Sequence, residues 1–135
     1  MFRLFVACVF AGSVSILTFP RLNNKLELRP QEEWAGTFRI SGQEDGNDYS
    51  GTAVVEVYGS GYRVTFIVNG RTASGVGQVR DGTLAIGWAM DGTAKNIACS
   101  TYRRKGSEIV GQWIALPSDG TMKSERLSRM READK

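Results

Sequence analysis

Three glutamates are the side chains in this sequence with the best placement for acid–base chemistry. Glu56, Glu108 and Glu125 each lie in a segment with strand-like composition, and two carboxylates on facing strands could hydrolyse a glycosidic bond. Their spacing singles out no pair. Glu125 differs from the others because it shares a strand face with Leu127, which is apolar and should point inward. A carboxylate there needs donors such as a Tyr hydroxyl or a Trp N–H, so we expect a structural hydrogen-bond acceptor.

Other catalytic side chains are scarce. The sequence has no histidine and two cysteines, Cys8 and Cys99, which excludes Ser-His-Asp and Cys-His catalysis and His-ligated metal sites. Cys8 lies in an apolar leader, so Cys99 is alone afterwards and is predicted to be a small packed residue. Gly75-Val76-Gly77 lacks the third glycine of a dinucleotide fingerprint. We therefore expect no enzyme activity, no metal and no cofactor.

Large aromatic residues form the best candidate for a ligand site. If their strands close into a barrel, they face its lumen, and an eight-stranded barrel is either filled by side chains or holds one small ligand. The abundance of bulky residues favours a filled lumen, and a cavity is the alternative. The candidate ligand-binding residues are Tyr62, Phe66, Trp88, Tyr102, Trp113 and Glu125.

The densest basic run is Arg103, Arg104 and Lys105, directly before Gly106. Lys and Arg number 17 against 14 Asp and Glu, and both signs are spread along the chain. A nucleic-acid binder shows a basic stripe with interleaved aromatics, and none is present. The run predicts a solvated hairpin turn, with contact to a protein partner or an anionic surface as the alternative. We expect no nucleic-acid partner.

Turn signals recur through the body of the chain. Asp-Gly or Asn-Gly pairs occur at 45–46, 69–70, 81–82, 91–92 and 119–120. These pairs favour tight hairpins because a type I′ turn needs positive φ at both central residues. Such regular spacing is typical of an all-β sandwich or barrel.

The segments between the turns alternate between apolar and polar residues, as half-buried strands do. Leu84, Ile86, Trp88 and Met90 share one face, so Trp88 should belong to the core. The pattern predicts eight strands, near 34–40, 51–58, 61–69, 72–80, 83–90, 95–102, 108–115 and 121–127.

Tight connections favour a single eight-stranded antiparallel up-and-down (meander) barrel, because closure pairs every edge. A β-sandwich is the alternative, and it needs longer crossovers. The longest loop is expected from Ser41 to Tyr49. Its acidic part, residues 44–48, lacks the ligand spacing of a calcium loop.

The ends of the chain differ in composition from the body. Residues 1–19 carry one early positive charge and then an apolar run, which predicts a helical signal peptide, or else a short membrane anchor. Residues 20–33 are a polar linker, residues 34–127 the β-barrel domain, and residues 128–135 a charged tail. The chain is therefore expected to be exported, to the periplasm, the cell surface or the medium, with membrane contact only if the leader is retained.

Short glycine-aromatic motifs between residues 34 and 127 carry a family resemblance. They include Trp34-x-Gly36, Tyr49-x-Gly51, Gly75-x-Gly77, Gly111-x-Trp113 and Glu125-x-Leu127. The chain resembles a group of small exported bacterial β-barrel proteins that are often labelled uncharacterised or "fibronectin-binding". In strand count alone it is also similar to avidin and the lipocalins. The resemblance implies an extracellular all-β domain and, as one alternative, an adhesion-type surface protein.

These features predict an exported, non-catalytic binding protein that uses the loops and rim of a small barrel, the rim including Arg103, Arg104 and Lys105. One alternative is a carrier that holds a small apolar ligand in the lumen. The partner's identity stays open, between an extracellular protein and a small apolar molecule.

We predict that the leader is removed during export, because its apolar run is shorter than the roughly 20 residues of a membrane-spanning helix. The mature chain should begin between Val14 and Arg29. Amino-terminal sequencing of protein from the producing cell checks this, and membrane-bound protein that still begins at Met1 would contradict it.

Overall fold

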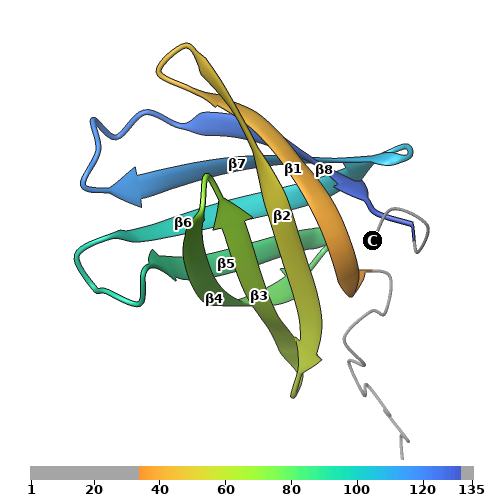
Figure 1. The fold of residues 1–135 in the computed structure, drawn as a ribbon. Helices are drawn as coiled ribbons and strands as arrows, with labels where there is room; N and C mark the ends of the chain where they lie inside the picture. Colours follow the sequence, from red (N-terminus) through yellow and green to blue (C-terminus); the bar gives the residue numbers. More distant parts are fainter. Residues whose placement is uncertain (1–33, 132–135) are drawn as a thin grey trace, which may run out of the picture.

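The computed structural model describes residues 34–131, which form a closed barrel of eight antiparallel strands (Figure 1). Each strand pairs with the next, and β8 pairs back with β1. The up-and-down barrel is thus confirmed over the sandwich. The strands are β1 (Gly36–Glu44), β2 (Asn47–Tyr58), β3 (Gly61–Val68), β4 (Arg71–Arg80), β5 (Thr83–Met90), β6 (Ile97–Lys105), β7 (Glu108–Leu116) and β8 (Lys123–Arg129). The predicted leader and linker lie outside the described residues, and β8 extends two residues into the predicted tail.

Tight turns dictate the meander. At the β3–β4 turn, φ is 51° at Asn69 and 73° at Gly70. The Asp-Gly pairs at 45–46, 81–82 and 91–92 also have positive φ at both residues. This is the backbone of a type I′ turn. Because such turns join neighbouring antiparallel strands, successive strands must pair with each other.

The predicted loop from Ser41 to Tyr49 is wrong. Strand β1 continues to Glu44, Asp45 and Gly46 make a two-residue turn, and β2 begins at Asn47. The strands are polar on both faces here, so the period-2 pattern that reveals a half-buried strand is missing. Two extended strands therefore have the composition of a loop.

Cys99 also differs from its prediction, because it is exposed rather than packed. On β6 the inward residues are Ser100 and Tyr102, so the strand's alternation places Cys99 on the outer face, paired with Gly87.

Inside the barrel, large side chains lie beside small ones. Phe66 pairs with Ala53 on one side and Ala73 on the other. Trp88 pairs with Gly75, where an added Cβ would lie 2.7 Å from the Cβ of Trp88. The small neighbours leave room for rings in a narrow lumen. Trp88 packs against the buried core, as its strand face predicted, while remaining partly exposed.

The two ends of the barrel differ. At one end Trp34, only 1% exposed, lies just before β1. The Arg104 guanidinium carbon lies 5.1 Å from the centroid of the Trp34 ring, and Arg129 donates to the carbonyl of Ala35 at 2.7 Å. We call this the closed end. The other, the open end, carries the β1–β2, β3–β4, β5–β6 and β7–β8 connections.

Trp34→Ala should lower the free energy of unfolding by about 3–5 kcal/mol, because it leaves a cavity at the closed end. Urea denaturation measures the loss. The matched control is Tyr58→Ala, since Tyr58 is an aromatic residue with 56% exposure. Equal losses of unfolding free energy in the two variants would contradict the conclusion that Trp34 fills the closed end.

Candidate functional site

Five residues on five adjacent strands form one row across the inner wall. Glu125 on β8 is flanked by Gly42 on β1 and Gly111 on β7. Gly42 pairs in turn with Tyr49 on β2, and Gly111 with Tyr102 on β6. The order around the barrel is therefore Tyr–Gly–Glu–Gly–Tyr, and we call it the tyrosine–glutamate row.

The two glycines let the tyrosines reach the carboxylate. A Cβ on Gly42 would lie 2.6 Å from Cζ of Tyr49, and a Cβ on Gly111 would overlap the ring of Tyr102. Each tyrosine thus lies flat across the neighbouring glycine, and any larger residue there would displace it.

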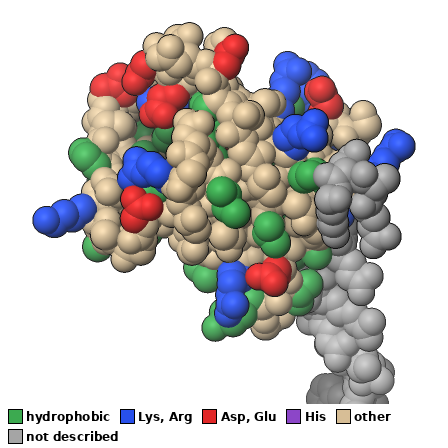
Figure 2. All heavy atoms as spheres, viewed as in Figure 1, with side chains coloured by type: hydrophobic (Ala, Val, Ile, Leu, Met, Phe, Trp, Pro, Cys, Tyr) green, Lys and Arg blue, Asp and Glu red, His purple; other side chains and the backbone are tan. Residues whose placement is uncertain are grey.

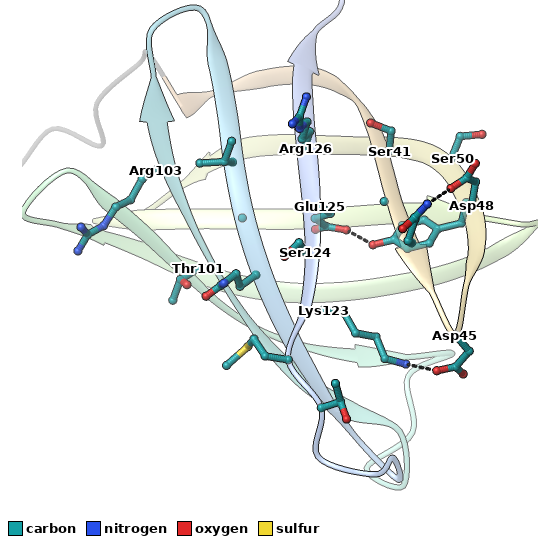
Figure 3. Close-up of a pocket in the computed structure, with 18 of the residues that line it drawn as sticks. Ser41, Asp45, Asp48, Ser50, Thr101, Arg103, Lys123, Ser124, Glu125 and Arg126 are labelled. Atoms are coloured by element: carbon teal, nitrogen blue, oxygen red, sulfur yellow. Dashed lines mark hydrogen bonds and ion pairs between the residues drawn. The ribbon is translucent and has the colours of Figure 1, made fainter.

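Hydrogen bonds hold the Glu125 carboxylate from both sides. The Tyr49 hydroxyl donates to Oε2 of Glu125 at 2.7 Å, as the dashed line in Figure 3 shows, and the Tyr102 hydroxyl donates to Oε1. Trp113 Nε1 donates to the Tyr49 hydroxyl at 2.8 Å. Glu125 is only 8% exposed. Tyrosine hydroxyls are among the donors that the sequence predicted for a carboxylate at this position.

Burial controls the titration of the row. It raises the pKa of Glu125 above its ordinary value, and the hydrogen bonds from Tyr102 and Tyr49 offset part of this rise. Burial and the nearby Glu125 charge raise the pKa values of Tyr49 and Tyr102. Both hydroxyls therefore stay protonated and remain donors.

Next to the row lies a hollow of about 100 Å³ at the open end, which we call the cup. The Phe66 and Trp88 ring centroids are 5.7 Å apart, those of Trp88 and Trp113 6.0 Å, and those of Tyr49 and Trp113 6.5 Å. The rings are tilted against one another by 53° to 71°. Tyr102 and Glu125 of the row line the cup, as do the apolar residues Ile40, Val68, Ala73 and Met90.

Charged residues lie at the mouth of the cup. Glu44 and Arg71 are among its lining residues, and Arg71 forms an ion pair with Asp91 at 2.8 Å. The Lys123 ammonium lies 5.2 Å from the centroid of the Trp113 ring. It also contacts Glu44 at 2.7 Å and Asp45 at 3.7 Å, and Figure 3 shows the side chain extending toward Asp45. Lys123 thus places its own ammonium group over the face of Trp113, a ring that lines the cup.

The structure brings together five of the six predicted ligand-site residues: Phe66, Trp88, Tyr102, Trp113 and Glu125. The sixth, Tyr62, is 1% exposed, pairs with Val57 and Gly77, and does not line the cup. Sequence reasoning missed Tyr49, although it begins an alternating inward series with Gly51 and Ala53.

The predicted basic turn is also placed differently. Arg103, Arg104 and Lys105 end strand β6, and the turn follows them. The Arg103 Nε donates to the Thr83 hydroxyl at 2.8 Å, while Arg104 stacks on Trp34. Alternation along the strand thus divides the run, and its three charges do not form one patch.

Two other predicted candidates do not join the site. Glu56 and Glu108 are both exposed, and Glu108 lies 3.7 Å from Arg126. A wide polar groove of about 1710 Å³ also runs over the strands around β8 (Figure 3). Its lining is mainly polar and charged, whereas the lining of the cup is mainly apolar and aromatic.

Within residues 34–131, no helix is long and apolar enough to cross a membrane. The same described residues contain no group of three or more Cys, Asp or Glu side chains placed to hold a metal ion.

No protein-family model matches the sequence, and no curated protein matches it. Among solved structures, the chain is similar to apo lipid binding protein 8 (LBP-8) of Caenorhabditis elegans. The two share 7% sequence identity with a TM-score of 0.49, over 74% of this chain and 97% of the other. At this degree of similarity, any ligand must be inferred from the cup itself.

Glu125→Gln should change how stability depends on pH. Because the folded pKa of Glu125 lies above its ordinary value of 4.5, the folded chain binds this proton more tightly than the unfolded chain. Stability is therefore lost as pH rises from about the ordinary value through the folded pKa. Relative to Glu125→Gln, the wild type should be more stable at about pH 4 than at about pH 8.

Urea denaturation across this range measures the difference. Glu56→Gln is the control, because Glu56 is exposed on β2. A wild-type advantage that grows with rising pH would contradict the raised pKa.

Proposed function

We propose that this chain is a non-enzymatic binding protein that takes a small, partly apolar ligand into the cup. The observation that carries the proposal is a hollow at the open end with five aromatic residues in its wall and the Glu125 carboxylate among its lining groups. Apolar walls with a few convergent polar groups are the usual form of a small-molecule site. The cup is therefore a better candidate than the loops and rim, whose basic run is divided.

The size of the cup limits the ligand. Pockets for drug-sized molecules measure roughly 300–1,000 Å³, whereas the cup measures about 100 Å³. It fits a group of a few heavy atoms, either a whole small molecule or the head of a longer one that extends through the mouth.

The chemistry of the row favours binding over catalysis. Both Glu125 oxygens already accept a tyrosine hydroxyl. The raised tyrosine pKa values keep these hydroxyls protonated near neutral pH, so neither can act as a base and each is a weak acid. We also propose that the protein acts outside the cytoplasm, which rests on the apolar stretch of residues 1–19.

Met90→Trp should block the cup, because Met90 lines it and is partly exposed. A suitable probe is 3,3-dimethyl-1-butanol, a small amphipathic alcohol, titrated while the tryptophan indole N–H signals are followed by NMR. The Trp88 and Trp113 signals should move in the wild type, whereas that of Trp34 at the closed end should not. Met90→Trp should weaken binding by about tenfold or more, since it fills the site.

Met122→Trp is the matched control, because Met122 is 54% exposed and does not line the cup. It should bind like the wild type. Unchanged binding in Met90→Trp, or signal changes confined to Trp34, would contradict the placement of the site.

A further inference from the structure

We propose that the ligand of the cup is an organic cation, the head of an amine or quaternary ammonium compound, with Glu125 as its counter-ion. This inference rests on the proposed function, because it names the chemical class of the ligand for the same cup.

No cationic side chain in the described part of the chain forms an ion pair with Glu125. The Glu125 carboxylate is buried, and its hydrogen bonds come from two neutral tyrosine hydroxyls. A buried charge is unfavourable unless it is paired, and each carboxylate oxygen retains capacity for a second interaction. Arg71 lines the cup but forms an ion pair with Asp91, so a cation in the cup would supply the opposite charge that Glu125 lacks.

The aromatic wall of the cup is suited to a cation. The faces of Trp, Tyr and Phe rings attract cations, and clusters of such rings recognise methylated ammonium groups. The cup contains two tryptophans, Trp88 and Trp113, with Phe66 and Tyr49 beside them. Lys123 already places its ammonium over one of these rings. The wall therefore provides cation–π contacts as well as apolar surface.

Negative charge is concentrated at the open end of the barrel. The open-end connections, their flanking strand ends and Glu125 carry six carboxylates and three cations, a net charge of −3. The carboxylates are Glu44, Asp45, Asp48, Asp91, Asp119 and Glu125, and the cations are Arg71, Lys95 and Lys123. The other charged residues between 34 and 131 are nine cations and three carboxylates, a net +6.

Figure 2 shows several acidic side chains gathered at the upper left, toward the β1–β2 turn. A negative mouth attracts cations and repels anions. Arg71 and Lys123, the cations at the cup, are already paired with carboxylates of the mouth. A carboxylate ligand such as a fatty acid would therefore meet like charge at Glu125 with no free cation beside it.

Three probes of similar shape and different charge test the inference. Choline is a cation, 3,3-dimethyl-1-butanol is its neutral isostere, and 3,3-dimethylbutanoate is an anion. Each is titrated into the full chain at neutral pH, with the Trp88 and Trp113 indole signals and calorimetry as readouts. Choline should bind about tenfold or more tightly than the alcohol, and the anion should bind most weakly.

Glu125→Gln retains the shape of the side chain and removes its charge, so it should abolish the preference for choline over the alcohol. Glu56→Gln, on the outer wall, should retain the preference. If Glu125→Gln does not fold, the wild type provides a second measurement. Its affinity for choline should fall as pH is lowered through the titration of Glu125, while its affinity for the alcohol stays constant.

The possible failures are distinguishable. If the alcohol or the anion binds in the cup as tightly as choline, the cation inference is wrong and the proposed function stands. A preference for choline that survives Glu125→Gln, or is independent of pH, overturns the counter-ion role. If none of the probes moves the Trp88 or Trp113 signals, the proposed function fails, and the inference fails with it.

Discussion

A buried carboxylate, held from both sides by tyrosine hydroxyls, is the constraint on which the open half of the barrel depends. Glu125 lies on β8, the last strand, and its donors come from β2 and β6, two strands away in either direction. Each tyrosine must cross an intervening strand, which is possible because Gly42 and Gly111 lie in its path. A single carboxylate thus requires glycine on two strands, at Gly42 on β1 and Gly111 on β7. Removing one donor would leave a buried polar group partly unsatisfied, which is among the more damaging changes a core can undergo.

The same row lies between two differently packed halves of the lumen. Toward the closed end, Trp34 and the buried aliphatic side chains fill the space, so this half serves stability. Toward the open end, Trp88 and Trp113 pack against the core and also line the cup. Their surroundings are more polar, because Trp113 donates to Tyr49 and Lys123 lies over its ring. A solid core and a small hollow therefore coexist in one narrow barrel.

The local features of the fold were predictable from sequence. Asp-Gly and Asn-Gly pairs specify tight turns, and tight turns require a meander. The alternation from Leu84 to Met90 gave the correct inward face for Trp88. At Gly42 and Tyr49 the same reasoning failed, because the strand ends at the open end are polar on both faces and resemble a loop.

The row itself was beyond the reach of sequence patterns. Its members are spread from residue 42 to residue 125, and they meet only because β8 closes against β1. The sequence indicated that Glu125 would need a donor, but it could not indicate which tyrosines would provide one. Charge behaves similarly: both signs are spread along the chain, yet folding brings the carboxylates at 44–48, Asp91, Asp119 and Glu125 to the open end. Register and closure, which depend on the whole barrel, create both features.

The most direct test of this account is the titration of the Glu125 carboxyl carbon by NMR, in chain labelled with ¹³C-glutamate, with and without choline. Glu125→Gln identifies the signal. The account predicts a pKa above the ordinary value of 4.5 in the free protein, and a lower pKa when choline is bound, because the cation stabilises the charged form. The central claim is that Glu125 is a buried carboxylate without a cationic partner in the free protein. A pKa at or below the ordinary value, unchanged when choline is added, would contradict it.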